Sequence, residues 1–259
     1  MIGAVAGDII GSVHEFVAPK NTEFPLFDVA TRFTDDTVLT IAVADCILTG
    51  SPYVESFHKY TKAYPGRIYG ARFLDWVESG SRSPYNSWGN GSAMRVSPVG
   101  FAFDDRDTVL AEAKLSAEVT HNHPEGIKGA QATALSVFMA RTGSSKSEIR
   151  ETIASEFSYD LERTVEEIRP GYEFNESCQA TVPEAIVAFL DSDDYESAVR
   201  LAISLGGDAD TLACITGGIA AAFYGGVPNE IAVQALAKLD NALRDVVEQF
   251  CDRFAVTIL

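Results

Sequence analysis

The stretch RFTDDTVLTIAVAD, residues 32–45, places two adjacent carboxylates at the beginning of an apolar segment with helical periodicity. The apolar side chains recur at i, i+3, i+4, i+7 and i+8, the positions that share one helix face: Val38, Leu39, Ala42, Val43, Cys46 and Ile47. Gly50-Ser51-Pro52 interrupts this pattern, which predicts a helix over residues 35–49. Asp35 and Asp36 repel each other there and contribute nothing to a core, so they call for another explanation.

Helical periodicity continues through most of the chain. It predicts further helices over residues 106–119, 124–141, 146–157, 179–190, 194–205, 209–224, 229–236 and 240–254. Strict alternation over a strand length is scarce, and no Asn-Gly hairpin pattern is present. The sequence therefore predicts an all-α fold, a single-domain helix bundle spanning residues 1–259. Residues 80–92 form the longest stretch rich in Gly, Pro and Ser, and its aromatic residues indicate a binding loop rather than a linker.

Composition excludes several classes of partner. The chain has 259 residues, 46% of them hydrophobic, and a formal net charge of −17. Such an acidic chain is not expected to bind a nucleic-acid backbone or an anionic membrane, because both need clustered Lys and Arg. The same charge favours a monomer by keeping molecules apart.

Nothing in the sequence indicates export, a membrane span or a thiolate metal site. The beginning of the chain has no basic region before its apolar residues, and no segment offers the roughly 18 uncharged apolar residues of a membrane span. We therefore expect a cytoplasmic protein with reduced thiols. The cysteines form no CxxC pair, which argues against a zinc or redox motif: Cys46, Cys178, Cys214 and Cys251.

A second acidic cluster echoes the first. In LGGDADTLACITGG, residues 205–218, Asp208, Asp210 and Thr211 again stand at the beginning of a predicted apolar helix. Helix capping is one interpretation, since Thr34 and Asp208 are good N-cap residues. A cap needs only one side-chain oxygen, however, and each cluster supplies three.

The alternative interpretation is a site for hard divalent cations. Clustered carboxylates raise one another's pKa unless a cation neutralises them. Ligands that are all oxygens favour Mg²⁺ or Mn²⁺ over Zn²⁺. Two ions bridged by an acid would use the six oxygen-bearing side chains of the two clusters.

Two further motifs indicate anion binding. In SWGNGSAMR, residues 87–95, glycines expose backbone N–H groups that can bind phosphate. Trp88 lies in this polar loop, either as an anchor or as a platform for a nucleobase. His121 and His123 precede the helix predicted at Pro124, where a histidine can bind an anion or simply cap the helix.

Taken in order, the motifs resemble those of the ADP-ribosylglycohydrolase family, which includes dinitrogenase-reductase-activating glycohydrolase and the ADP-ribosyl-acceptor hydrolases. They are GDxxGxxxE at residues 7–15, TDDT at 34–37, GNGSAMR at 89–95, THNHP at 120–124 and GGDADT at 206–211. The likeness spans residues 3 to about 226. It implies an all-α orthogonal bundle, a binuclear Mg²⁺ or Mn²⁺ centre, and removal of ADP-ribose from an acceptor by cleavage of an N- or O-glycosidic bond.

The resemblance also implies roles for particular residues. The metal ligands it implies are Thr34, Asp35, Asp36, Asp208, Asp210 and Thr211. Glu15 and Asp36 are the implied catalytic acids, and Glu15 matches an acid that ligates a metal, gates the site or transfers protons. The implied substrate-binding residues are Ser87, Trp88, Gly89, Asn90, Gly91 and His121, whereas His123 falls on a variable position.

The acceptor does not follow from these motifs. ADP-ribosyl-arginine is the first expectation, and ADP-ribosyl-serine and O-acetyl-ADP-ribose are alternatives. We expect the partner to be an ADP-ribosylated protein or a small ADP-ribose conjugate. A catalytically silent ADP-ribose-binding or structural protein on the same scaffold is a further possibility, as is a di-metal phosphohydrolase. The presence of all six candidate ligands and of Glu15 favours the hydrolase.

Overall fold

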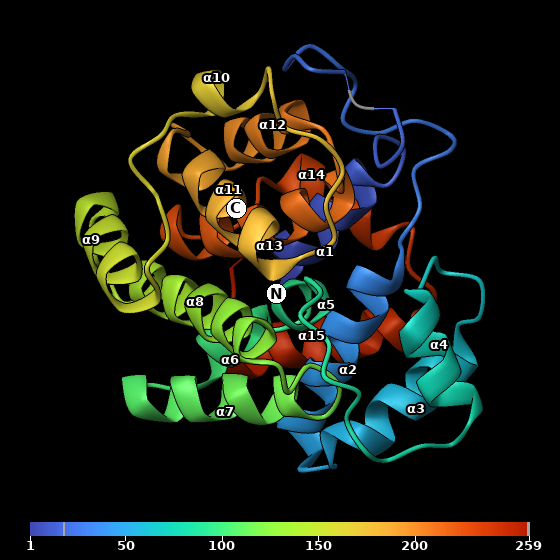
Figure 1. Cartoon of the computed structure of the whole chain (residues 1–259). Coiled ribbons are helices and arrows are strands. Elements are labelled where there is room, and N and C mark those ends of the chain that lie inside the picture. The colour runs from blue at the N-terminus through green and yellow to red at the C-terminus, as the bar shows by residue number, and fades with distance from the viewer. Residues whose placement is uncertain (18, 258–259) are drawn as a thin grey trace.

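The computed structural model describes residues 1–17 and 19–257 and confirms the all-α fold (Figure 1). Its helices are α1 (Ile2–Gly11), α2 (Asp35–Thr49), α3 (Tyr53–Ala63), α4 (Ala71–Glu78), α5 (Gly91–Met94), α6 (Ser97–Ala102), α7 (Arg106–Glu118), α8 (Pro124–Arg141), α9 (Lys146–Phe157), α10 (Val165–Ile168), α11 (Cys178–Leu190), α12 (Tyr195–Leu205), α13 (Ala209–Phe223), α14 (Asn229–Leu236) and α15 (Asn241–Phe254).

A stripe of glycines on α1 fixes the centre of the fold. Gly3, Gly7 and Gly11 recur every fourth residue, which places them on one helix face. A Cβ atom at Gly7 would lie 2.0 Å from the carbonyl oxygen of Ala213, and one at Gly11 would lie 2.5 Å from the Cα of Asp210. Only glycine permits this approach. The two helices therefore run antiparallel in close contact, and the end of α1 lies against the beginning of α13.

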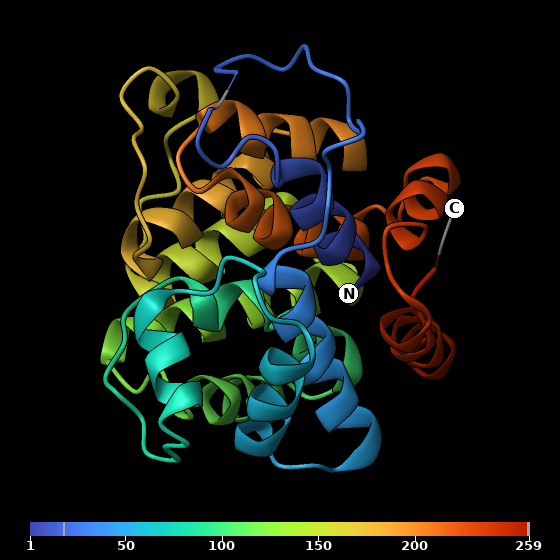
Figure 2. The same cartoon turned by 90° about the vertical axis from the view of Figure 1, so that its right-hand side faces the viewer.

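The remaining helices surround this pair in layers. α8, α11 and α12 pack against α13, and α7 and α9 flank α8 (Figure 1). α14 and α15 form an outer layer that covers α1 and α2, as Figure 2 shows. The buried residues form one hydrophobic core across these layers. No helix within the described residues combines the length and apolarity needed to cross a bilayer.

Strong periodicity located helices to within a residue or two. The predictions over residues 35–49, 124–141, 146–157 and 229–236 match α2, α8, α9 and α14 at both ends. The pattern gave no prediction for α1, because every residue of that helix is buried and no polar face marks its period. It also gave none for α3 and α4.

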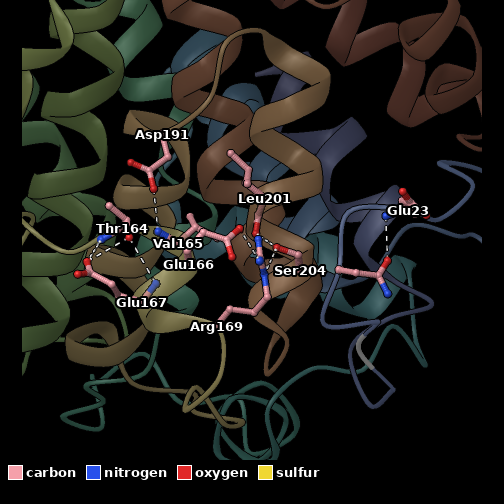
Figure 3. Close-up of polar contacts among 10 residues, drawn as sticks. Glu23, Thr164, Val165, Glu166, Glu167, Arg169, Asp191, Leu201 and Ser204 are labelled. Carbon is pink, nitrogen blue, oxygen red and sulfur yellow. Dashed lines mark hydrogen bonds and ion pairs between the residues drawn. The ribbon is translucent and has the colours of Figure 1, made fainter.

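Three long loops line one cavity together with the beginnings of α2 and α13: the described parts of residues 12–34 (12–17 and 19–34), residues 79–90 and residues 169–177. The third follows α10, which is anchored by side chains. A capping box joins Thr164 and Glu167, and the backbone N–H of Val165 donates to Asp191 (Figure 3). Arg169 then donates to Ser204 at 3.0 Å, which ties the start of this loop to α12.

Candidate metal centre and substrate cavity

The two acidic clusters converge on one cavity of about 550 Å³. Asp35 and Asp36 reach it from the first turn of α2, and Asp208 and Asp210 reach it from the beginning of α13. The hydroxyl of Thr211 donates to Asp36 at 3.2 Å, which joins the two clusters directly. The structure therefore brings together residues that lie about 170 positions apart in the sequence.

Of the other two residues expected near the metals, Glu15 belongs to the lining of the cavity and Thr34 does not. Glu15 lines the cavity from the loop after α1. Thr34 is buried and caps α2, because its side chain accepts a hydrogen bond from the backbone N–H of Asp36. Capping thus accounts for Thr34, but it does not account for Asp208, whose side chain makes no cap hydrogen bond to α13.

Asp8 is a central residue of this site to which the sequence pattern gave no role. Its carboxylate accepts hydrogen bonds from the backbone N–H and the hydroxyl of Thr34, at 3.0 and 2.6 Å. It also accepts from the N–H and the hydroxyl of Thr37. These four hydrogen bonds fix the beginning of α2 on α1. The motif GDxxG contained the signal, because a buried aspartate between helix-packing glycines needs donors of this kind.

The carboxylates form a cluster that a cation would stabilise. One oxygen from each of Asp8, Asp36 and Asp210 lies within 4.8 Å of the other two. Burial raises the pKa of all three, and neighbouring carboxylates raise those of Asp36 and Asp210 further. Oδ1 of Asp36 is buried and, among the described residues, has no hydrogen-bond partner. An unpartnered buried carboxylate oxygen among like charges fits a hard divalent cation.

Glu15 is less deeply buried. Burial, followed by the charges of Asp208 and Asp8, raises the pKa of Glu15 to about 7. Oε2 of Glu15 also finds no hydrogen-bond partner within the described chain. A carboxyl group with a pKa near neutrality can both accept and donate a proton.

The glycine loop is fastened to this acidic cluster. The side-chain amide of Asn90 donates to Asp208 at 2.7 Å, and its backbone N–H donates to the carbonyl of Glu176 at 2.7 Å. Ser87, Gly89, Asn90 and Gly91 all line the cavity. The loop and the acids therefore line one cavity.

The two histidines of THNHP separate in the structure. His123 caps α8, because its Nδ1 accepts from the backbone N–H of Glu125 at 3.1 Å. His121 is buried and lines the cavity instead. Burial, with the positive charges of Arg95 and Arg72, holds the pKa of His121 well below its usual range, so its ring is neutral at pH 7.

The neighbours of His121 bear on which ring nitrogen carries the proton. The Thr120 hydroxyl accepts from the Arg95 guanidinium at 3.0 Å and lies 2.7 Å from Nδ1 of His121. In the tautomer in which this hydroxyl donates to Nδ1, the ring proton is on Nε2. Nε2 faces the loop, because a Cβ atom at Gly89 or Gly91 would lie 3.5 or 3.3 Å from it. In that tautomer His121 presents an N–H donor where a phosphate would meet the loop.

Trp88 lies outside the lining of this cavity. Its side chain is 48% exposed and packs edge-on against His123, with ring centroids 5.6 Å apart. The cavity has aromatic residues of its own: Phe16, Tyr69, Phe73, Tyr85 and Phe174. The sequence pattern did not single these out, because they come from four separate segments that only the fold brings together.

Comparisons with known proteins identify the family to which this chain belongs. The sequence profile described as ADP-ribosylglycohydrolase matches residues 1–258. The chain belongs to the ADP-ribosylglycohydrolase family. It is 28% identical to ADP-ribosylhydrolase ARH3 of Bos taurus, in an alignment that covers 87% of this chain and 84% of the relative. It is 26% identical to ADP-ribosylarginine hydrolase Tri1 of Pseudomonas putida, over 89% of this chain and 71% of that protein.

A solved structure also shares the fold of this family member. The structure is described as an ADP-ribosylglycohydrolase-related protein complex, and it superposes with a TM-score of 0.72 at 23% sequence identity. The match covers 96% of this chain and 94% of the solved one. Almost the whole chain therefore adopts the known fold.

Proposed function

We propose that this chain is a metal-dependent hydrolase that removes ADP-ribose from an acceptor by cleaving an N- or O-glycosidic bond. The observation that carries the proposal is the joining of two parts in one cavity. One part is an acidic cluster with an unpartnered buried carboxylate oxygen on Asp36. The other is a glycine loop faced by the neutral ring of His121. ADP-ribose has ribose hydroxyls at one end and a diphosphate in its middle, which match these two parts.

Two Mg²⁺ or Mn²⁺ ions would be held by oxygen ligands from the two helix beginnings: Thr34, Asp35, Asp36, Asp208, Asp210 and Thr211. Bound there, they would supply Lewis acidity and orient the hydroxyls of the distal ribose. Asp8 would act as a positioning residue, because its oxygens already accept four hydrogen bonds that hold Thr34 and the beginning of α2. Asn90 would position Asp208 in the same way.

The chain's own groups divide the remaining work. The N–H groups of the loop from Ser87 to Gly91 and Nε2–H of His121 would bind the diphosphate. Glu15 or Asp36 would take a proton from the attacking water and return one to the departing acceptor atom. The water oxygen then ends on the anomeric carbon of the ribose as the bond to the acceptor breaks. Trp88, on the outer side of the loop, would offer its ring to the adenine.

For the acceptor we propose arginine first, with serine and acetyl-ester conjugates as alternatives. Similarity to an ADP-ribosylarginine hydrolase supports arginine, and similarity to ARH3 supports membership in the hydrolase branch without specifying the acceptor. A silent ADP-ribose-binding scaffold would keep the loop and lose its acids. The presence of Glu15 and of both acidic clusters favours the active enzyme.

Product analysis tests this proposal. The metal-stripped protein is incubated with ADP-ribosyl-arginine, with and without Mg²⁺ or Mn²⁺, and the products are separated by chromatography. We expect intact ADP-ribose and free arginine, formed only with metal. AMP with ribose phosphate would instead identify a phosphohydrolase, and binding without turnover of any conjugate would identify a silent scaffold. Asp75→Ala, on the exposed face of α4, is a control that should leave turnover unchanged.

A further inference from the structure

An exposed aromatic pair stands at the mouth of the cavity. The side chains of Phe16 and Phe174 are 74% and 47% exposed, yet both line the cavity. Their rings are nearly parallel, with an interplanar angle of 22° and centroids 6.3 Å apart. Phe16 directly follows Glu15 in the sequence, so the pair lies next to the acid that would act on the acceptor.

The two loops that carry this pair are fastened to each other. The ammonium group of Lys20, from the loop of Phe16, donates to the carbonyls of Arg169 and Tyr172 at 3.1 and 2.6 Å. It donates to the carbonyl of Leu205 as well, at 2.6 Å. Arg169 is itself tied to α12 through Ser204 (Figure 3). Hydrogen bonds outside the aromatic pair therefore join the loop of Phe174 to Lys20.

Charges are distributed unevenly along the cavity. Glu15 and Glu176 line the cavity, one residue before Phe16 and two residues after Phe174. The cations that line the cavity, Arg72 and Arg95, lie beside His121 instead. Arg95 donates to Thr120, the residue before His121, and Arg72 donates to the carbonyl of Tyr85, whose ring lies 6.1 Å from that of His121. The diphosphate suits the cationic end, which leaves the acidic, aromatic end for the group on the other side of the ribose.

We propose that Phe16 and Phe174 form the acceptor subsite and that its occupant is the guanidinium group of an ADP-ribosylated arginine. This inference rests on the proposed hydrolase function, and it names the residues by which the enzyme would select its acceptor. A guanidinium is flat, positively charged and weakly hydrated, and it stacks on aromatic faces. Glu15 and Glu176 complement its charge. A serine conjugate offers neither the flat face nor the charge.

Acceptor-dependent kinetics test the proposal. The value of kcat/KM is measured for ADP-ribosyl-arginine and ADP-ribosyl-serine peptides, and the affinity for free ADP-ribose is measured separately. The wild type should favour the arginine conjugate. Phe16→Ala with Phe174→Ala should lower kcat/KM for it about tenfold, mainly through KM, the size of a cation–π contact of ~1–2 kcal/mol. Free ADP-ribose lacks the acceptor, so its affinity should not change.

Two matched variants separate recognition from packing. Phe16→Leu with Phe174→Leu keeps apolar bulk but removes the aromatic faces, so the loss for the arginine conjugate should persist. If leucine restored wild-type kinetics, the pair would be a structural anchor and the proposal would be wrong. Val29→Ala, a fully exposed change on the loop of Phe16, should have no effect.

Other outcomes distinguish this proposal from the proposed function. Equal losses for arginine and serine conjugates, or an inherent preference for serine, would overturn the acceptor subsite while leaving the hydrolase intact. If the wild type hydrolyses no conjugate, the hydrolase fails, and the subsite is tested by affinity alone. In that case ADP-ribosyl-arginine should bind more tightly than ADP-ribose, and the alanine pair should abolish the difference. Equal affinities would reject the subsite.

Discussion

The beginnings of α2 and α13 carry similar acidic clusters, but the protein stabilises them differently. At α2, Thr34 caps the helix and Asp8 accepts four hydrogen bonds from Thr34 and Thr37. At α13, no side chain caps the helix, and the contact to Asp208 comes from Asn90 of a distant loop. The first cluster is thus built by hydrogen bonds within the helical core, whereas the second depends on a loop and, as we propose, on bound cations.

Removing a shared acid should have the largest effect. Asp36 belongs to α2 but accepts from Thr211 of α13, so it links the two clusters. We expect Asp36→Ala to reduce metal-dependent hydrolysis to background and to remove metal binding, measured by calorimetric titration with Mn²⁺. Asp75→Ala is the matched control. Retained metal affinity in the Asp36 variant would show that the clusters act separately.

Asp8→Asn tests the acidic cluster at the beginning of α2, which hydrogen bonds to Asp8 hold in place. The amide oxygen can keep the two N–H donors and the Thr37 hydroxyl, but its NH₂ group then faces the Thr34 hydroxyl, which must turn from donor to acceptor, and the carboxylate charge that strengthens all four hydrogen bonds is lost. We expect a lower melting temperature and a metal affinity weakened by about 10–100-fold, the usual cost of losing a residue that orients ligands. Circular dichroism separates the two effects. An unchanged metal affinity in a folded variant would exclude a positioning role for Asp8.

Asn90→Ala tests the acidic cluster at the beginning of α13, which depends on a contact from the glycine loop. The change removes the amide donor to Asp208, and a hydrogen bond to a charged group is worth ~1.5–3 kcal/mol. Metal affinity should fall about tenfold, and the melting temperature should change less than in Asp8→Asn. Asn229→Ala, an exposed change at the beginning of α14, serves as the control. A fall in stability equal to that of Asp8→Asn would mean that both clusters belong to the core.

Metal removal should make stability depend on pH. The pKa values of Asp36 and Asp210 are raised, and that of Glu15 is raised to about 7. Groups with raised folded-state pKa values bind protons more strongly when folded, so their contribution is complete below the unfolded pKa of ~4 and is lost as pH rises through the folded values.

Histidines such as His121, whose pKa is lowered, act in the opposite direction over the same interval, so the acids are tested by the change in melting temperature that Mg²⁺ causes. Mg²⁺ should raise the melting temperature at pH 7.5 and have a smaller effect at pH 5, where protons already neutralise the acids. Thermal unfolding with EDTA or Mg²⁺ at both pH values measures this. A rise with Mg²⁺ that is equal at the two pH values, or larger at pH 5, would contradict the raised pKa values.

The sequence predicted the parts of the molecule that depend on local pattern. Periodicity defined α8 and α9, and the motifs around Asp36 and Asp210 placed acids at helix beginnings that the structure brings together. Helix capping alone explains the position of Thr34. It does not explain why Oδ1 of Asp36 is buried without a hydrogen-bond partner among the described residues.

The rest depends on contacts between distant segments. The motif GDxxG marks Asp8 as an acid in an apolar helix, but its donors, Thr34 and Thr37, follow only from the fold. His121 and His123 are equivalent in the sequence, but one is buried beside the loop and the other caps α8. Phe174 lines the cavity from a loop that Lys20, far away in the sequence, holds through the carbonyl of Arg169.

Calorimetric titration with ADP-ribose tests the central claim most directly. The metal-stripped protein is titrated with and without Mg²⁺ or Mn²⁺, alongside the variant that carries Asp35→Ala and Asp36→Ala. The account predicts binding that the divalent cation strengthens in the wild type, and no such strengthening in the variant. Absence of ADP-ribose binding under every metal condition would contradict it, because the acidic clusters and the glycine loop would then serve another ligand.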